Sequence, residues 1–398
     1  MNTVVDNKAI NSMGFRLTEE QEMIRQMTAE FADKEIKPFC GQWDKEDKVP
    51  MDVLAKMHDL GLTNIGIPAE YDGQGLDNLT RYTVIDELGQ RDAGIATTIV
   101  ASSLLATDPI MVGANDEQKK WWFGRMLEGA MCAFCLTEPG AGSDALGMTM
   151  KCTKDGNDWI LNGTKQFITN GGFAKQFSVF ATKDKTLGNK GICCFMVDRD
   201  FPGVKIGNKE DKLGIRSTST TEVIFDDVRV PGWMCIGGDG GGTPVLMETL
   251  DYSRTAIAAL ATGISTGALN AALAYANERK QFGKPISSFQ AISFMLADMA
   301  TTTEASRLLY QKAAWCQDNG LPFKMLSNMA KMYAADTAMK NTVDGVQIFG
   351  GYGYIKEYPA EKFMRDAKIM QIFEGTVQVQ RMVIGKYLTK DGKYTYTV

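Results

Sequence analysis

The sequence is poor in histidine and lacks a basic excess. His58 is the one histidine in 398 residues, so a histidine-rich metal site is excluded and a Ser-His-Asp triad is not expected. The net charge is −5, which argues against nucleic acid as a partner. We find no apolar run long enough to span a bilayer, so membrane insertion is not predicted.

The eight cysteines are scattered along the chain, which fits a reduced compartment better than a disulfide framework. Cys132 and Cys135 match C-x-x-C, but the surrounding run Met131–Leu136 is typical of a buried strand, where residues three apart face opposite sides. We therefore interpret both as core cysteines and predict no metal site. Residues 1–14 contain Asp6 and no arginine and resemble neither a signal peptide nor a transit peptide, so a cytoplasmic location is expected.

The hydrophobic pattern divides the chain into three parts. Residues 1–130 are predicted to be helical, with a capping box at Thr18 and Gln21 and helices near 18–38, 50–61, 78–90, 95–112 and 117–127. Residues 131–238 are predicted to form an antiparallel β domain, with strands near 132–137, 148–154, 159–169, 176–182, 191–197, 204–207 and 222–230. Residues 239–398 are predicted to return to helices, near 245–279, 289–319, 324–349, 360–370 and 377–388. The expected fold class is α+β.

The glycine cluster Gly237–Gly242 separates the second and third parts. It does not fit G-x-G-x-x-G, because Thr243 stands where the third glycine is needed, and no strand–loop–helix unit surrounds it. We interpret the cluster as a hinge loop.

Glu374 is the first candidate for chemistry. It follows the apolar residues Ile372 and Phe373 and precedes Gly375. Apolar neighbours desolvate a carboxylate and raise its pKa, which makes it a stronger base, and glycine allows the backbone to approach a ligand. The alternative is a solvated glutamate favoured by the start of the helix that follows.

Four other segments carry polar or aromatic groups at the ends of elements. They are Leu136–Asp144, Phe167–Gly171, Arg279–Lys284 and Gln347–Tyr354. Each has an alternative structural explanation: a hairpin loop, a strand end, cations at a helix C-terminus and a helix C-cap. The cations of the third segment also suit phosphate groups.

Together, and in this order, these segments resemble the acyl-CoA dehydrogenase family of flavoproteins. The matching pieces are LTEPGAGSD, GTKQFITNGG, DYSR, RKQFGKPISSFQAISFMLADMA, QIFGGYGY and IFEGTVQVQR, and the resemblance extends from about Leu17 to Leu388. It is closest to the short-chain and butyryl members. The resemblance implies an N-terminal helical domain, a middle β domain and a C-terminal four-helix domain, with FAD bound between the last two.

The resemblance also implies the residues that bind cofactor and substrate. Two groups are implied to contact the flavin: a first loop with Phe134, Leu136, Thr137 and Ser143, and the segment against the flavin ring with Phe167, Ile168 and Thr169. Two further groups are implied to bind the FAD of a neighbouring subunit: Arg279, Gln281, Phe282 and Gln290, and then Gln347 and Gly351. Thr376 and Gln378 are implied to lie near the adenine. Its substrate-binding positions are Ser143, Asp251, Arg254 and Gly375. The i, i+3 spacing of Asp251 and Arg254 also allows a plain ion pair.

By the same resemblance, Glu374 is the catalytic base that removes the α-proton of an acyl-CoA thioester, while a hydride leaves the β-carbon for flavin N5. Some members place the base just before the arginine, but Ser253 occupies that position here and cannot serve. The family implies that the backbone N–H of Glu374 and an FAD hydroxyl hold the thioester oxygen, as an oxyanion hole does. It also implies a homotetramer built as a dimer of dimers and an electron-transfer flavoprotein as electron acceptor.

The acyl group and the exact activity stay open. The same fold includes oxidases, flavin monooxygenases and, in principle, a catalytically dead binding scaffold, although the presence of Glu374 and Arg254 argues against the last. We expect a small, uncharged acyl group, such as butyryl or an alicyclic ring. Glutaryl-CoA is less expected, because residues 95–105 match the acyl-pocket helix and the arginine of glutaryl enzymes corresponds to about Ala96. A buried carboxylate without a partner is costly. Arg91, one turn before this helix, is the one nearby cation in the sequence, and the carboxylate of Asp92 beside it would repel a distal carboxylate of the substrate.

Overall fold

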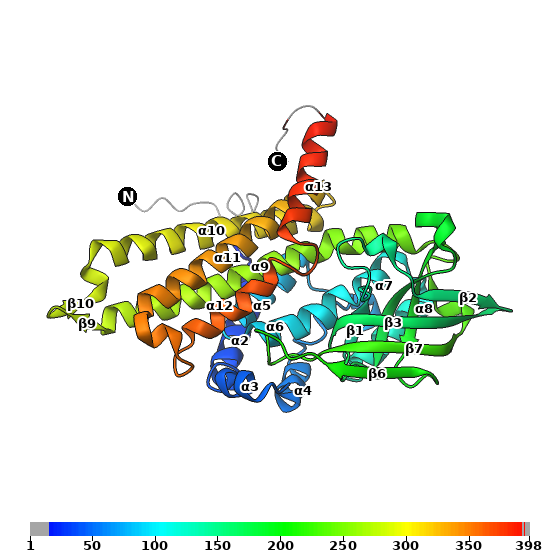
Figure 1. Ribbon diagram of the computed structural model, residues 1–398, viewed down its shortest axis with the longest axis horizontal. Helices are drawn as coiled ribbons and strands as arrows, with labels where there is room; N and C mark the ends of the chain where they lie inside the picture. Colours follow the sequence, from blue (N-terminus) through cyan, green and yellow to red (C-terminus); the bar gives the residue numbers. More distant parts are fainter. Residues whose placement is uncertain (1–15, 392–393, 395–398) are drawn as a thin grey trace.

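The computed structural model describes residues 16–391 and Tyr394; residues 1–14, on which the expected cytoplasmic location rests, lie outside this range. Helices occupy residues 19–127, a β-sheet occupies residues 132–236, and long helices occupy residues 242–391 (Figure 1). The order helical, β, helical is therefore confirmed.

The N-terminal helices follow their sequence signals at most positions. They are α2 (Glu19–Glu35), α3 (Cys40–Glu46), α4 (Met51–Asp59), α5 (Asn78–Gly89), α6 (Ala93–Ile99), a π-helical segment (Val100–Leu105), α7 (Asp108–Gly113) and α8 (Asp116–Leu127). The capping box at Thr18 and Gln21 is present, with distances of 2.9 and 3.2 Å. The prediction of one helix over residues 95–112 is wrong, because the segment widens into the π-helix and restarts at α7, whose first turn contains Pro109.

One eight-stranded sheet lies within the described residues. Its strands are β1 (Cys132–Cys135), β2 (Lys151–Asp155), β3 (Asp158–Thr169), β4 (Gln176–Thr182), β5 (Ile192–Asp198), β6 (Val204–Lys209), β7 (Thr220–Val230) and β8 (Cys235–Ile236). The order is β6-β7-β3-β2-β4-β5-β8, with β1 beside β4. The sheet is mostly antiparallel as predicted, but β1 runs parallel to β4, because the β2–β3 hairpin separates them and no tight turn sets their direction.

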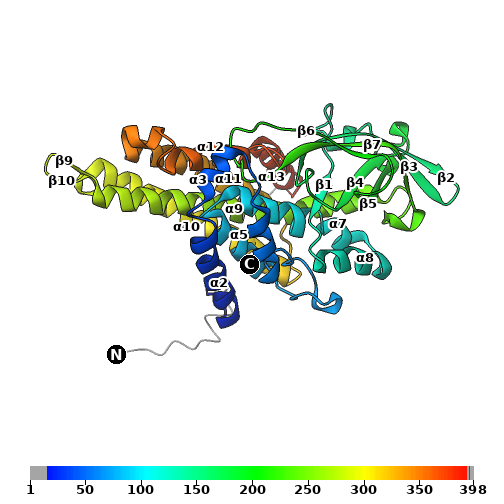
Figure 2. The same ribbon diagram turned by 90° about the horizontal axis from the view of Figure 1, so that it is seen from below.

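The C-terminal part contains three long helices and two shorter ones. These are α9 (Gly242–Glu278), α10 (Gln290–Asp318), α11 (Lys324–Phe349), α12 (Ala360–Met370) and α13 (Val377–Asp391). A small hairpin, β9 (Lys280–Gln281) and β10 (Lys284–Pro285), joins α9 to α10. The hairpin and the tip of β2 lie at opposite ends of the molecule (Figures 1 and 2).

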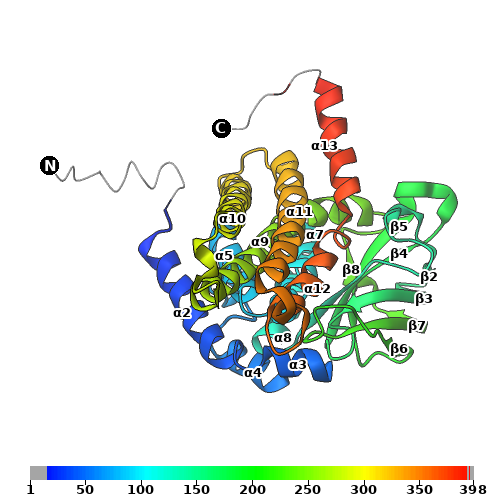
Figure 3. The ribbon, with the colours of Figure 1, turned by 60° about the vertical axis from the view of Figure 1, so that its left-hand side comes forward.

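The first and last helical parts share one hydrophobic core. Residues of α2, α4, α5 and α6 pack in the same buried cluster as residues of α9, α11 and α12, and α9, α10 and α11 lie side by side (Figure 3). The helices α5 and α9 approach closely at Gly263, where a Cβ atom would lie 2.3 Å from the carbonyl oxygen of Asp86. By contrast, Ile110, Trp122 and Phe123 of α7 and α8 pack into the core of the sheet.

Two helical stretches, residues 93–113 and 242–278, are apolar and long enough to cross a membrane by length and composition. The expectation that no such stretch exists therefore needs correction. In these stretches 83% and 72% of the apolar window is buried inside the protein, as in the core helices of a folded domain.

Candidate active site

Glu374 lies on a tight turn between α12 and α13. Its φ angle is 54°, in the left-handed region, and Gly375 follows with a φ of 82°. The turn is held from two sides: Lys331 Nζ donates to the carbonyl oxygen of Gly375 at 2.7 Å, and Gln380 Nε2 donates to the carbonyl oxygens of Glu374 and Gly375 at 3.2 and 3.0 Å. A non-glycine residue in this region costs about 1–3 kcal/mol, and such strain concentrates at functional sites.

The Glu374 carboxylate contacts the long helix α9. Ser253 Oγ donates to its Oε2 atom at 2.9 Å. Burial raises the pKa of Glu374 above its usual value, while the hydrogen bond from Ser253 and the charges of Arg254 and Lys331 lower it. A carboxylate with a raised pKa and a positive surrounding is suited to accept a proton near neutral pH.

The predicted rise in the pKa of Glu374 and its predicted cause, desolvation, are both present, but of the two apolar neighbours only Phe373 packs against the hydrophobic core. The preceding Ile372 is 49% exposed and contributes little to desolvation. The side chains that contact the carboxylate and its turn come from α9 and α11, which are more than forty residues away in the chain.

The expected Asp251–Arg254 ion pair is present, with an N–O distance of 3.1 Å. Lys324 Nζ contacts the second oxygen of Asp251 at 3.0 Å. Arg254 is 5% exposed, and its Nε atom has no hydrogen-bond partner in the described part of the chain. A buried N–H without a partner is available to a ligand, so the ion pair does not account for the whole side chain.

The loop after β1 and the end of β3 lie against each other. The backbone N–H of Gln166 donates to the carbonyl oxygen of Thr137 at 2.8 Å. Lys165 Nζ donates to the carbonyl oxygen of Leu136 at 2.9 Å and contacts Glu138 Oε1 at 2.8 Å. Both side chains of this ion pair are almost fully buried, so it fixes the base of the loop. The structure thus brings the first two groups of predicted flavin-binding residues together.

The surface of these two segments has an aromatic and a hydroxylic part. Phe167 is 61% exposed and has a φ angle of 58°, while Ile168 is buried and Thr169 half-buried. Phe134 is half-buried and packs on Phe180. Of the loop residues, Leu136 is buried, Thr137 half-buried and Ser143 exposed.

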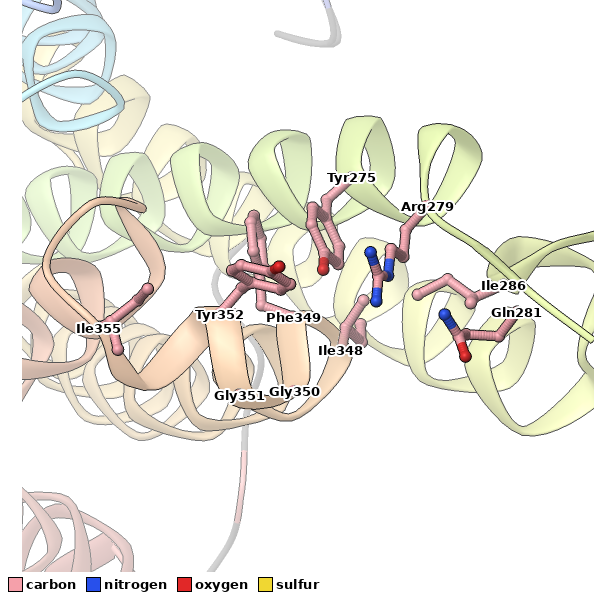
Figure 4. A pocket seen from close by; sticks show the side chains of 10 residues that line it. All are labelled: Tyr275, Arg279, Gln281, Ile286, Ile348, Phe349, Gly350, Gly351, Tyr352 and Ile355. Carbon is pink, nitrogen blue, oxygen red and sulfur yellow. The ribbon is translucent and has the colours of Figure 1, made fainter.

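A third group of predicted residues lines a separate pocket of about 450 Å³ at the outer end of α9 and α11 (Figure 4). Arg279 lies over the ring of Tyr352 at 5.4 Å, and Tyr275 stacks on Phe349. The space where Gly351 would carry a Cβ atom is open. Gln281 lines the same pocket, while Phe282, Gln290 and Gln347 are exposed. The hairpin that carries Gln281 and Phe282 lies far from the sheet (Figure 1), so one chain does not bring this group to the flavin loops.

Both surfaces fit FAD. An exposed aromatic ring beside hydroxyl groups suits a flat ring system, and an exposed guanidinium beside open glycine backbone suits phosphate. The last two predicted FAD residues stand at the start of α13: Thr376 Oγ1 accepts from the backbone N–H of Val379 at 3.2 Å, and Gln378 is exposed. Thr376 therefore caps a helix in addition to any contact with a cofactor.

The cation that stands just before the expected acyl-pocket helix in the sequence is already paired. Arg91 contacts Asp33 at 2.9 Å and Glu87 at 2.6 Å, so it is held between α2 and α5. Ala96, near the position expected to match the arginine of glutaryl enzymes, is fully buried.

The sequence interpretation missed several residues around the base. Ser253 cannot act as a base, but it positions Glu374, and Lys331 and Gln380 hold the turn. Gln380 stands within the motif IFEGTVQVQR, and a lysine on the apolar face of a helix is the one signal for Lys331. Lys331 is fully buried, and burial lowers its pKa to about 8.

The remaining expectations concern cysteine and metal. All eight cysteines are free, and Cys132 and Cys135 are buried in the core. Burial raises the pKa of Cys132 to about 12. Among the described residues there is no group of three or more side chains that could hold a metal ion. His58 is half-buried, and its ring contacts Thr63 Oγ1 at 3.0 Å.

Comparisons with known proteins agree over nearly the whole chain. Three family models match: "Acyl-CoA dehydrogenase, N-terminal domain" at residues 18–130, "middle domain" at 133–228 and "C-terminal domain" at 240–389. The short-chain specific acyl-CoA dehydrogenase of Clostridium acetobutylicum is 43% identical, over 94% of this chain and 98% of the relative. The butyryl-CoA dehydrogenase of Megasphaera elsdenii has a TM-score of 0.92 and 42% identity, over 94% of this chain and 99% of that one.

A further solved structure, described as "Electron transferring flavoprotein of Acidaminococcus fermentans: Towards a mechanism of flavin-based electron bifurcation", is also similar. Its chain has a TM-score of 0.93 and 45% identity, over 95% of this chain and 100% of that one.

Proposed function

The chain belongs to the acyl-CoA dehydrogenase family, and on that premise we propose that it dehydrogenates a short acyl-CoA thioester with Glu374 as the base. It is an oxidoreductase that acts on CH–CH groups of acyl-CoA and uses FAD. The assignment of the base rests on the half-buried carboxylate of Glu374, whose pKa is raised, on a strained turn that two other elements hold in place.

The turn also supports binding of the thioester oxygen. The backbone N–H of Glu374 has no acceptor among the described residues, and the positive φ angles of Glu374 and Gly375 form a tight turn there. A free, rigid N–H in a water-poor site can donate to an oxygen on which negative charge develops. Glu374 would thus supply the base from its side chain and one oxyanion donor from its backbone.

The residues around the base tune its proton affinity. Ser253 holds the carboxylate in one orientation, and the cations Arg254 and Lys331 keep it ionised before the reaction. When substrate excludes water, the carboxylate loses remaining solvation and becomes a stronger base. FAD, when bound, supplies the hydride acceptor. We propose that Phe134, Leu136, Thr137, Ser143, Phe167, Ile168, Thr169, Thr376 and Gln378 hold it, and that Ser143, Asp251, Arg254 and Gly375 contact the acyl-CoA.

We propose that the acyl group is small and uncharged. The helical segment at residues 93–105 offers no cation, since Ala96 is buried and Arg91 is engaged by two carboxylates. A carboxylate at the end of the acyl group would find no cation on this segment, and a buried carboxylate without a partner costs several kcal/mol. Butyryl and alicyclic acyl groups avoid this cost.

The experiment is flavin bleaching by a panel of acyl-CoA thioesters under anaerobic conditions. Butyryl-, hexanoyl-, cyclohexanecarbonyl- and glutaryl-CoA are mixed with the FAD-loaded enzyme at equal concentration. Rapid bleaching by one of the uncharged thioesters is expected. A clear preference for glutaryl-CoA would contradict the proposed substrate, and a flavin that no thioester bleaches would contradict the dehydrogenase reaction itself.

We further propose that the enzyme works as a homotetramer and passes electrons to an electron-transfer flavoprotein. The pocket lined by Arg279, Gln281 and Gly351 lies at the far end of the chain from the sheet that carries the proposed flavin-binding segments (Figure 1). It is therefore suited to the FAD of a neighbouring subunit. Phe282, on the hairpin beside it, is 92% exposed, as expected for a residue covered by another subunit. Sedimentation that shows an active, FAD-saturated monomer would contradict the tetramer, and a lack of flavin reoxidation by an electron-transfer flavoprotein would contradict the acceptor.

A further inference from the structure

Three polar side chains that the proposed reaction does not use lie near the base, where the first turns of α5 and α7 meet α9. They are Arg81, Asp108 and Thr249, and we call them the polar end group. Arg81 and Thr249 each have a buried polar atom without a partner in the described part of the chain, and Asp108 is buried beside them. Buried polar groups in native proteins are nearly always paired, so two such atoms beside a buried carboxylate need an explanation.

Asp108 is the carboxylate of the polar end group. It is 8% exposed, yet within residues 16–391 no hydrogen bond or ion pair reaches its carboxylate. Burial raises the pKa of Asp108 to about 7, with Arg81 opposing the change and Glu374 adding to it. Arg81 and Glu374 are thus the charged groups that act on Asp108.

Arg81 and Thr249 are incompletely paired as well. One terminal nitrogen of Arg81 donates to Asn78 Oδ1, but its Nε atom is buried without a partner among residues 16–391. Thr249 is fully buried, and its hydroxyl has no partner there either. Thr249 precedes Ser253 by one helical turn, so both point from the same face of α9, and Ser253 is the residue that contacts Glu374.

The packing of α7 on α9 places Asp108 and Thr249 at a similar height along the axis of α9. A Cβ atom on Gly113, at the end of α7, would lie 2.5 Å from Val245 Cγ2 on α9. Asp108 is five residues earlier, roughly 7.5 Å along the helix. Ile99 and Leu104 pack in one core cluster with residues 256–264 of α9, whereas Ile110 packs in another with Val245 and Leu246. The chain therefore runs antiparallel to α9 here, which brings Asp108 level with Thr249 and Ser253.

The polar end group follows directly on the segment proposed to line the acyl pocket. The hydroxyls of that segment are already used: Thr98 donates to Thr218 Oγ1 at 2.8 Å, Ser103 donates to the carbonyl oxygen of Thr63, and Ser102 Oγ accepts from the N–H of Cys132 at 2.8 Å. The π-helix at Val100–Leu105 then leads into α7, and π-helical turns are frequent at functional sites. Asp108 thus supplies a carboxylate without a hydrogen-bond partner among the described residues, just after the segment proposed to line the acyl pocket.

We propose that Arg81, Asp108 and Thr249 bind a hydroxyl group carried by the acyl chain beyond its β-carbon. This inference rests on the proposed dehydrogenation of a short, uncharged acyl-CoA and specifies its substrate class. A hydroxyl group both donates and accepts, so it can donate to Asp108 and accept from Arg81 Nε while the acyl group stays uncharged. An alkyl end would leave all three groups unpaired, and a carboxylate would face the like charge of Asp108. Aliphatic and phenolic hydroxyl groups share this chemistry.

The test compares matched thioester pairs in the FAD-loaded enzyme by the rate of flavin bleaching. The aliphatic pairs are butanoyl- to octanoyl-CoA and their terminal hydroxy derivatives, and the aromatic pair is phenylpropanoyl-CoA and its para-hydroxy derivative. The wild type should favour the hydroxy member of at least one pair by about ten- to a hundredfold in kcat/KM. Which pair shows the preference distinguishes an aliphatic from a phenolic substrate.

The variants Asp108→Leu and Arg81→Met should reduce that preference to about onefold. Asp108→Asn, which keeps the side-chain shape, guards against misfolding and should also weaken the preference. Arg91→Met is the matched control, because this second arginine, just after α5, is engaged by Asp33 and Glu87, and it should keep the preference.

Equal or better turnover of the alkyl member in every pair would overturn the inference and leave the proposed function intact. A hydroxy preference that survives in Asp108→Leu and Arg81→Met would overturn it too. Absence of bleaching by every thioester would overturn both proposals, so the two failures are distinguishable.

Discussion

Ser253→Ala should move the acidic limb of the pH profile to higher pH. The Ser253 hydroxyl donates to the Glu374 carboxylate at 2.9 Å and lowers the pKa of that carboxyl against the effect of burial. Removing the hydroxyl removes a bond that exists only to the charged form, so the pKa rises further. The base must be ionised to take the α-proton, so activity is lost at the low end of the pH range.

The expected displacement of the limb follows from the strength of that bond. A hydrogen bond to a charged group contributes about 1.5–3 kcal/mol, and a pKa change of one corresponds to about 1.4 kcal/mol. The limb should therefore move by about one to two pH units, and a water molecule in place of the hydroxyl would reduce the movement to about one. At a pH below the limb, kcat/KM should fall about tenfold for each pH unit that the limb moves, while the plateau at high pH should be nearly unchanged.

The assay is kcat/KM for flavin bleaching across pH, which reports the ionisation of the free enzyme. Ser265→Ala is the matched control: it also lies on α9, but its hydroxyl bonds to Thr303 at 2.6 Å and not to the base. An acidic limb that stays in place in Ser253→Ala, or moves to lower pH, would refute the role given to this hydroxyl. A limb that moves equally in Ser265→Ala would show a general effect of helix α9.

Three further predictions concern the base, the flavin loop and the subunit contact. Glu374→Gln should keep FAD and acyl-CoA binding but slow flavin bleaching by about two to four orders of magnitude; near-normal bleaching would place the base elsewhere. Lys165→Met should leave the buried Glu138 without its 2.8 Å partner and lower the free energy of unfolding by about 3–5 kcal/mol, measured by denaturant titration; an unchanged midpoint would argue that the pair does not hold the loop. Arg279→Ala should lower FAD occupancy of the assembled protein, measured from the flavin absorbance per chain, and full occupancy would contradict its role at a neighbour's cofactor.

The order of the elements could be predicted from sequence because local signals set it. The apolar periodicity of residues 324–349 and 360–370 predicts the observed bounds of α11 and α12, and the run at 176–182 predicts β4. The prediction for residues 95–112 failed because nearly every side chain there is buried, so no polar face marks where the helix changes its turn. Helix α3 was missed because it is only seven residues long.

The candidate site was predictable only in part. Glu374 and the ion pair of Asp251 with Arg254 could be located, because they lie within short motifs or at helical spacing. Ser253 and Lys331 acquire their roles from the Glu374 turn, which lies 121 residues from the first in sequence and more than forty from the second. No local pattern records such a pairing, and the parallel pairing of β1 with β4 was missed for the same reason.

The shared core of the first and last helical parts has a consequence for how the protein is made. Helix α5 ends at Gly89, whereas α9, against which it packs, begins at Gly242. On the ribosome, at about 5–20 residues per second, the N-terminal helices emerge roughly ten to thirty seconds before their partner. During that interval Leu88 and its apolar neighbours, fully buried in the finished protein, stay exposed, which makes the nascent chain a client for chaperones that bind apolar segments.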